Sequence, residues 1–132
     1  MGTLMLGRFL TKALSQKKSV RILEIGAGIG GTTEHILEQL TGHNIPFSYT
    51  FTDTSRSLVA QAGTRITVPN NIACIVLDIE NPPSSEFGCY DIVIASNAIH
   101  ATKDLLASSR NCFRLLKPGG ILCLVELMRD LW

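Results

Sequence analysis

Five short apolar segments alternate with stretches of helical periodicity, and this alternation restricts the fold more than any other feature of the chain. The apolar segments cover residues 20–25, 47–52, 72–77, 91–95 and 121–127. Most of them are apolar at consecutive positions, as in strands that are buried on both faces. Helical spacing of apolar side chains is found at about residues 4–16, 32–40, 55–64 and 102–116. The pattern predicts an α/β fold with a doubly wound, Rossmann-like, mainly parallel sheet of about five strands.

Length, charge and cysteine usage narrow the class of protein. The chain has 132 residues, 45% of them hydrophobic, and a formal net charge of +1. It is expected to form one domain over residues 1–132, without the charge that a nucleic-acid or membrane partner would require. No apolar run approaches the ~18 residues of a membrane span, and no signal peptide is expected. The four cysteines lack C-x-x-C spacing, which predicts no metal site and favours a reducing, cytoplasmic location.

The helical segments carry their own start and stop signals. Gly42 is expected to cap the helix of residues 32–40 at its C-terminus. Thr102 is the expected N-cap of the helix that follows the fourth strand. That helix is predicted to bury a stripe of apolar side chains: Leu105, Leu106, Cys112, Phe113, Leu115 and Leu116. The next segment, Lys117-Pro118-Gly119-Gly120, is expected to separate the helix from the last strand.

A glycine-rich turn follows the first predicted strand directly. Glycines let a backbone turn sharply and approach a ligand that side chains would block. Gly26, Gly28 and Gly31 match the dinucleotide pattern G-x-G-x-x-G. Gly26, Gly28 and Gly30 equally match the G-x-G-x-G loop of nucleoside-binding methyltransferases. The loop by itself therefore indicates an adenosine-containing ligand and leaves both classes open.

Acidic side chains end two of the predicted strands. Asp53 follows the second strand and Asp78 the third, so both are expected at the carboxyl edge of the sheet, where such folds bind ligands. Asp53 can accept both hydroxyls of a ribose, and Asp78 can accept from an adenine amine. Either residue could instead serve as a helix N-cap. Glu24, two residues before the first glycine, is expected to hold the loop or to face a positively charged part of the ligand.

A histidine and a glutamate follow or end the last two strands. His100 lies just after the fourth strand, and Glu126 lies within the fifth predicted strand. If these strands are neighbours, their backbones are ~4.8 Å apart and the two side chains can meet. A carboxylate on one imidazole nitrogen fixes the tautomer and supports the charge that the ring gains on taking a proton. The pair is therefore a candidate general base with its orienting partner, although each side chain could instead have only a local structural role.

The chain resembles class I S-adenosylmethionine-dependent methyltransferases in its strand–glycine loop–helix unit and in three strand-end motifs: Phe51-Thr52-Asp53, Leu77-Asp78-Ile79-Glu80 and Leu116-Lys117-Pro118-Gly119-Gly120. More narrowly, it looks like the C-methyltransferase domain of fungal iterative polyketide synthases. That likeness is carried by ILEIGAGIGGTT, YTFTDTSRSLVAQA, LDIENPP, DIVIASNAIHATKDL and LLKPGGILCLVE. It covers about residues 21–126.

The resemblance implies methylation of the α-carbon of a β-ketoacyl chain, held as a thioester on an acyl carrier protein in polyketide secondary metabolism. His100 would correspond to the base that removes the α-proton, and Glu126 to its partner. S-adenosyl-L-methionine would be the cofactor, and other synthase domains would be partners. The cofactor-binding residues would be Gly26, Gly28, Gly30, Asp53 and Asp78, with Asn97 lining the pocket.

The chain departs from the family pattern in two places. Ile29 stands where the family usually has threonine, so weaker cofactor binding is expected. The family core continues past the fifth strand with another helix and two strands. Residues 121–127 are therefore expected to form an apolar sheet edge, which could support self-association.

Two other functions stay open at the level of the sequence. A non-catalytic, degenerate S-adenosylmethionine-binding module would keep the glycine loop without the chemistry. A nicotinamide-dependent oxidoreductase is favoured only by the ambiguous loop and lacks a Tyr-x-x-x-Lys pair.

Overall fold

The computed structural model describes residues 19–66, 71–96 and 103–125; the helix predicted at about residues 4–16 lies outside these ranges. Within them, five strands form one parallel sheet in the order β3-β2-β1-β4-β5. The strands are β1 (Val20–Ile25), β2 (Phe47–Asp53), β3 (Ile72–Val76), β4 (Tyr90–Ser96) and β5 (Leu116–Val125). The strand order reverses between β1 and β4, as in doubly wound folds. The predicted fold class is confirmed.

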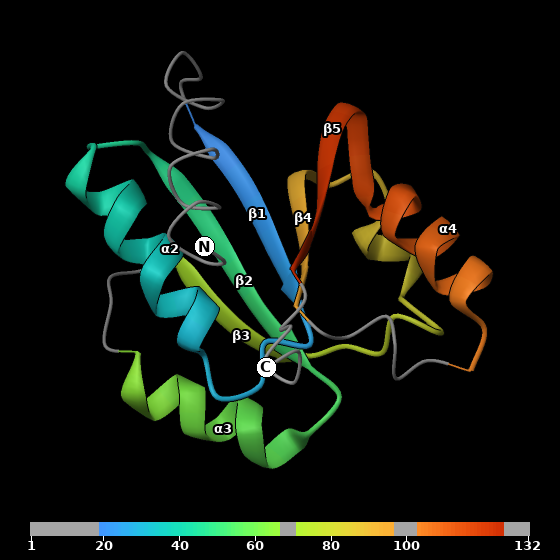
Figure 1. The fold of residues 1–132 in the computed structure, drawn as a ribbon, viewed down its shortest axis with the longest axis horizontal. Helices are drawn as coiled ribbons and strands as arrows, with labels where there is room; N and C mark the ends of the chain where they lie inside the picture. The colour runs from blue at the N-terminus through green and yellow to red at the C-terminus, as the bar shows by residue number, and fades with distance from the viewer. Residues whose placement is uncertain (1–18, 67–70, 97–102, 126–132) are drawn as a thin grey trace, which may run out of the picture.

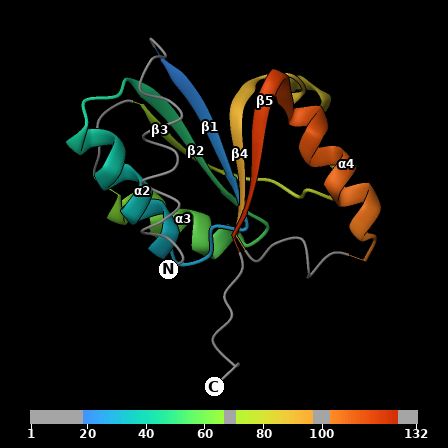
Figure 2. The same ribbon diagram turned by 45° about the horizontal axis from the view of Figure 1, so that its top comes forward.

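Helices lie on opposite sides of this sheet. Helices α2 (Gly31–Gly42) and α3 (Arg56–Arg65) lie together on one side, and α4 (Leu105–Leu115) lies on the other (Figures 1 and 2). A short 3-10 helix, η1 (Ser84–Glu86), precedes β4. None of the described helices has the length and apolar character needed to cross a membrane.

The central strand β1 shows why the sheet is apolar at nearly every position. Val20 and Ile22 pack into the cluster that contains the buried face of α2, whereas Leu23 and Ile25 pack into the cluster that contains α4. Successive side chains of a strand point to opposite faces, so a strand covered on both sides buries all of them. The apolar runs in the sequence are the direct result of this double coverage.

Helix α2 ends slightly later than predicted. Gly42 is its last residue, and His43 occupies the C-cap position, with its backbone N–H donating to the Gln39 carbonyl. The left-handed residue after the helix is Asn44, with a φ of 54°. Asparagine tolerates this conformation better than most residues, so it takes the place that the sequence analysis gave to Gly42.

The prediction for the face of α4 was wrong for three of its six residues. Leu105, Leu106 and Phe113 are 58%, 67% and 62% exposed. Within the helix, the buried side chains are instead Ser108, Asn111, Cys112 and Leu115. These four also follow the i, i+3, i+4, i+7 spacing of one helix face. Cys112 and Leu115 were predicted correctly, whereas hydrophobicity alone could not identify the two polar members, Ser108 and Asn111.

The start of α4 also differs from the prediction. Asp104 is the N-cap, and its carboxylate accepts a hydrogen bond from the Ala107 backbone N–H at 3.0 Å. Aspartate is among the preferred N-cap residues, and its negative charge is stabilised by the positive end of the helix dipole. Thr102, the predicted cap, lies outside the described residues.

Strand β5 begins directly after α4 rather than beyond a separate connection. Its pairing with β4 jumps from Leu116 opposite Tyr90 to Ile121 opposite Ile92, so the intervening residues form an irregularity within the strand. A side chain at Gly120 would meet the Asp91 carbonyl oxygen at 3.0 Å, which explains the glycine there. Lys117 Nζ lies 3.3 Å from Asp91 Oδ2 and holds the same irregularity.

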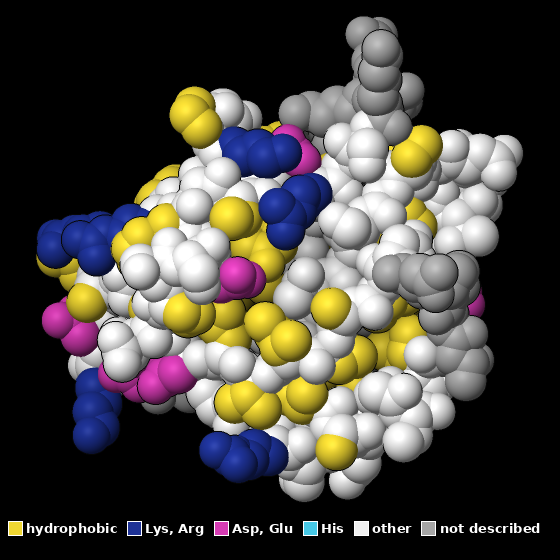
Figure 3. Space-filling view, turned by 180° about the vertical axis from the view of Figure 1, so that it is seen from behind, with side chains coloured by type: hydrophobic (Ala, Val, Ile, Leu, Met, Phe, Trp, Pro, Cys, Tyr) yellow, Lys and Arg dark blue, Asp and Glu magenta, His cyan; other side chains and the backbone are white. Residues whose placement is uncertain are grey.

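Strand β5 lies at an edge of the described sheet, as predicted, and Leu124 on it is 57% exposed. At the other edge, Ile75 and Val76 of β3 are 37% and 49% exposed. Seen from behind, hydrophobic side chains are visible across the centre of the molecule (Figure 3). The two edges of the described sheet therefore both carry apolar surface.

Candidate functional site

The glycine loop leaves β1 at the carboxyl edge of the sheet and leads into α2 (Figure 1). Gly26, Gly28 and Gly30 have φ angles of 66°, 60° and 88°, in the left-handed region that favours glycine. The Ala27 N–H donates to the Thr52 carbonyl at 3.0 Å and ties the loop to β2. A side chain built on Gly28 would meet no atom within 4 Å. The backbone at Gly28 thus borders open space, where a ligand can approach closely.

Asp53 lies beside this loop at the end of β2. Its Oδ2 accepts the Gly28 N–H at 3.0 Å, and its Oδ1 accepts the Ser55 N–H at 2.9 Å. The half-buried carboxylate has about four lone-pair positions, so these two bonds leave acceptor capacity for further donors. The arrangement fits a nucleoside, because a free acceptor and an open glycine backbone lie next to each other at the strand switch point. Asp53 also precedes α3, but its N-cap is Ser55.

Glu24 is fully buried beneath the loop. Its Oε1 accepts hydrogen bonds from the Tyr49 hydroxyl at 2.6 Å and from the Thr33 hydroxyl, and its carbonyl accepts from Thr52 Oγ1 at 2.7 Å. Burial and the nearby carboxylate raise the pKa of Tyr49 well above its ordinary value. These contacts join β1, β2 and the first turn of α2, which agrees with the expectation that Glu24 holds the loop. Its contact with a ligand stays a prediction.

Asp78 lies in the segment after β3, one strand farther from the loop. Its side chain is exposed, and Oδ1 accepts the Glu80 N–H at 2.9 Å. The Leu77 N–H donates to the Asp53 carbonyl at 3.1 Å, so the ends of β2 and β3 stay together. From the other side, Asn111 of α4 donates to the Ile79 carbonyl at 2.9 Å. Asp78 thus lies in an anchored turn at the same sheet edge as Asp53.

The predicted base, its partner and one cofactor-binding residue lie outside the described residues: His100, Glu126 and Asn97. The structure does describe the two strands that lead to them. Strands β4 and β5 are parallel neighbours, and Ser96 pairs with Val125 at their carboxyl ends. Asn97 and Glu126 are the next residues in the sequence after these paired ends. His100 and Glu126 were expected to meet if the fourth and fifth strands are neighbours. The structure shows these strands as neighbours. The contact between the two side chains stays a prediction.

Three side chains near the glycine loop were not predicted from the sequence: Thr33, Tyr49 and Arg65. The first two bind Glu24, and the Arg65 guanidinium donates to the Ile29 carbonyl. A buried glutamate needs donors, so a tyrosine on the next apolar strand was a usable signal. No local signal could have found Arg65, because it lies 36 positions after Ile29.

The cysteines fill space within the described part of the chain. All four are free, and Cys112 is fully buried. Burial raises the pKa of the Cys112 thiol to about 11, so it stays protonated and unreactive near neutral pH. Among the described residues, no group of three or more His, Cys, Asp or Glu side chains could hold a metal ion.

Comparison with known proteins distinguishes the two classes of nucleoside-binding loop. The family described as "Methyltransferase domain" matches residues 23–122. The chain is 49% identical over 135 residues to 5-methylorsellinic acid synthase of Aspergillus terreus (strain NIH 2624 / FGSC A1156). That match covers 99% of this chain and 5% of the synthase. The methyltransferase interpretation of the loop is therefore favoured over the dinucleotide one.

Solved structures show the same similarity. The citrinin polyketide synthase CMeT domain has a TM-score of 0.87 and 37% identity, covering 92% of this chain and 34% of that one. The trans-methyltransferase CalH, in a complex with SAH, has a TM-score of 0.76 and 38% identity, with the same two coverages of 92% and 34%. The chain thus spans about a third of each of these solved chains and a small part of the similar synthase.

Proposed function

Because this chain belongs to the methyltransferase domain family, we propose that it binds S-adenosylmethionine and directs methyl transfer to the α-carbon of a carrier-bound β-ketoacyl thioester. One observation carries the proposal: the Asp53 carboxylate accepts the Gly28 N–H beside the open backbone of the loop. Support for the β-ketoacyl thioester as the methyl acceptor comes from similarity to a polyketide synthase CMeT domain and to a synthase named for a methylated product.

The nucleoside end of the cofactor is assigned to the carboxyl edge of β1, β2 and β3. Asp53 accepts the ribose hydroxyls, and Asp78 accepts the adenine amine. The left-handed glycines, Gly26, Gly28 and Gly30, allow close approach of the backbone. Glu24 supports the loop from below through its two hydroxyl contacts. Asn97, the next residue after β4 in the sequence, is proposed as a further cofactor-binding residue. Similarity to CalH, solved with SAH, supports the choice of cofactor.

The proton transfer is assigned to His100 with Glu126 as its partner. His100 takes the α-proton of the β-ketoacyl chain, and the electron pair left on that carbon forms the new carbon–carbon bond. Glu126 accepts the hydrogen bond from the other ring nitrogen and stabilises the imidazolium. The cofactor, when bound, supplies an electrophilic methyl group on a sulfonium, whose carbon–sulfur bond breaks as the new bond forms. Support comes from the pairing of Ser96 with Val125, because Asn97 and Glu126 follow these two residues directly in the sequence.

The length of the relatives suggests partners for such a reaction. The matched synthase is far longer than the matched region, which covers 5% of it. We therefore assign the acyl carrier and the other synthase domains as the partners of this core. The exposed apolar side chains of α4 provide surface against which such domains can pack.

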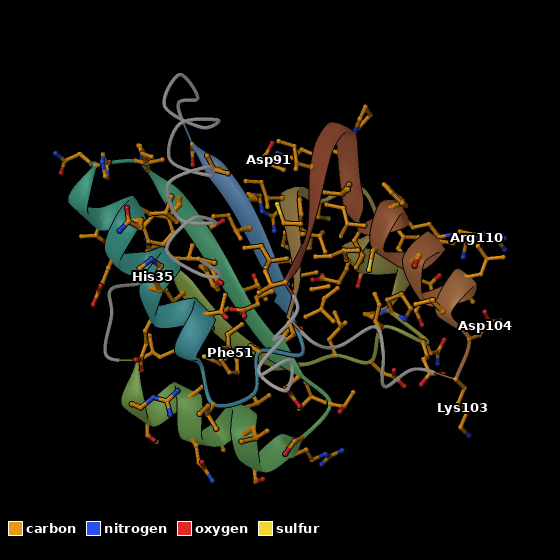
Figure 4. All side chains as sticks on the ribbon, viewed as in Figure 1. His35, Phe51, Asp91, Lys103, Asp104 and Arg110 are labelled. Carbon is orange, nitrogen blue, oxygen red and sulfur yellow. The ribbon has the colours of Figure 1, made fainter. Side chains whose placement is uncertain are left out.

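Cofactor binding is tested by calorimetric titration of the chain with S-adenosylmethionine, with NAD as the comparison ligand. We expect binding of the sulfonium cofactor alone. The variant D53N should weaken it about 10- to 100-fold, because a charged acceptor of two hydroxyls is lost. The matched control is D104N, which changes the aspartate at the N-terminus of α4 (Figure 4) and keeps its capping ability. Equal affinities for the two variants would refute the assignment of Asp53.

The base is tested by exchange of the α-proton of a β-ketoacyl pantetheine thioester in deuterated water, and by transfer of labelled methyl. We expect H100A to slow both by about 10²- to 10⁴-fold and to leave cofactor affinity unchanged. The control is H43A, because His43 is exposed at the end of α2. Exchange that survives H100A would exclude His100 as the base. Cofactor binding by a wild type that catalyses neither exchange nor methyl transfer would favour a binding module without catalysis.

A further inference from the structure

Arg65 joins the glycine loop to two helices. It lies in the last turn of α3, and its Nη2 donates to the backbone carbonyl of Ile29 at the tip of the loop. Its Nε lies 3.3 Å from Oε1 of Glu34, in the first turn of α2. One planar guanidinium therefore contacts the loop and the helix that follows it. A guanidinium can do this because its donors point in several fixed directions, whereas a lysine ammonium is a single compact charge.

Arg65 also lies close to the third glycine of the loop. A side chain built on Gly30 would lie 2.5 Å from Arg65 Nη2 and 3.6 Å from Phe51 Cε2. Gly28, by contrast, has no neighbour within 4 Å. Both glycines have a left-handed φ, and they differ in what surrounds them. The space at Gly28 faces outward for a ligand, and the space at Gly30 is filled by Arg65.

The loop segment between these glycines carries the donor that Asp53 uses. The Gly30 N–H donates to the Ala27 carbonyl at 3.0 Å, and the Gly28 N–H donates to Asp53 at 3.0 Å. Ile29, whose side chain is 77% exposed, has no packing of its own to fix this segment. The hydrogen bond that the Ile29 carbonyl accepts from Arg65 ties this segment to α3.

We propose that Arg65, with Glu34 as its anchor, is a positioning residue that holds the glycine loop in the conformation that binds the nucleoside. The proposal rests on the proposed function, because the loop is the cofactor-binding element there. Arg65 acts through the backbone of Ile29 and Gly30 and is not assigned a contact with the cofactor. Its effect is therefore expected on affinity and on loop order.

Binding of S-adenosylhomocysteine to the full chain gives the first test. R65A should weaken binding about tenfold, which is the effect of losing one charged hydrogen bond. R65K keeps the charge but not the two-directional contact, so it should recover only part of the affinity. E34Q should lower affinity less than R65A, because the bond to the Ile29 carbonyl remains. The matched control is R56A, an exposed arginine in the first turn of the same helix, which should bind as the wild type does.

Amide hydrogen exchange of the ligand-free chain gives the second readout. R65A should speed exchange at Gly28 and Gly30 and leave the amides of β1 unchanged, whereas a general loss of stability would speed both. If the wild type binds and R65A binds equally well, Arg65 is not a positioning residue. If neither the wild type nor any variant binds S-adenosylhomocysteine, the proposed function fails. Hydrogen exchange then still decides whether Arg65 orders the loop. Unchanged exchange in R65A would overturn the inference in either case.

Discussion

Two units of the molecule share the same alternation of strand and helix but differ in how many large apolar side chains they leave exposed. In the unit β1–α2–β2–α3, the large side chains of Phe51 and Tyr49 are fully buried, and even a glutamate is enclosed by its donors. In the unit β4–α4–β5, Leu105, Leu106 and Phe113 remain exposed on the helix. Figure 4 shows Phe51 between the sheet and α3, and Arg110 at the outer side of α4.

This difference shows which of the two units exposes more apolar surface. The unit that carries the glycine loop and Asp53 buries Phe51 and Tyr49 fully, so the nucleoside site rests on closely packed side chains. The other unit presents apolar surface on a helix and on the edge strand β5, which a protein in water tends to cover. Paired substitutions of the same residue type in the two units can test the comparison.

Two phenylalanines provide the largest expected contrast. F51A should lower the free energy of unfolding by about 3–5 kcal/mol, because it empties a fully buried position beneath α3. F113A should change it by less than about 0.5 kcal/mol, since Phe113 is mostly exposed and alanine favours a helix. Urea denaturation followed by circular dichroism measures both. Similar losses in the two variants would mean that α4 is packed as tightly as α3.

The only two tyrosines of the chain provide a smaller contrast, one in each unit. Y49F removes a buried donor from Glu24 and should cost about 1–3 kcal/mol of unfolding free energy. Y90F removes a partly buried bond to Glu86 and should cost less than about 1 kcal/mol. The same denaturation experiment applies. A greater loss in Y90F would contradict the view that the polar network beneath the loop is the more enclosed one.

The pH dependence of stability sharpens the tyrosine comparison. Burial raises the pKa of Tyr90 to about 12, and that of Tyr49 rises well above its ordinary value. Above about pH 10 the unfolded chain releases these protons and the folded chain keeps them. The unfolding free energy should therefore be constant below that pH with respect to tyrosine ionisation and decrease above it. Y49F should make the decrease shallower, and an unchanged slope would mean that Tyr49 ionises equally in both states.

Much of the fold follows from local patterns in the sequence. Runs such as Val20–Ile25 must be covered on both faces, and the turn after them must be glycine-rich because its backbone enters the left-handed region. The positions of Asp53 and Asp78 at strand ends then follow from the parallel arrangement. The sequence could not fix the face of α4, because burial there depends on a polar contact between Asn111 and the Ile79 carbonyl.

The amino-acid sequence alone therefore determined the strands, the order of strands and helices, the glycine loop and the acidic residues beside it. These depend on side-chain periodicity and on backbone conformations that few residues adopt. Only the tertiary structure decided which face of α4 is buried, how Glu24 finds its donors, and that Arg65 reaches Ile29. Those outcomes depend on contacts between residues far apart in the chain, such as the 36 positions that separate Ile29 from Arg65. No local pattern encodes them, because they form only when the sheet brings the separate segments together.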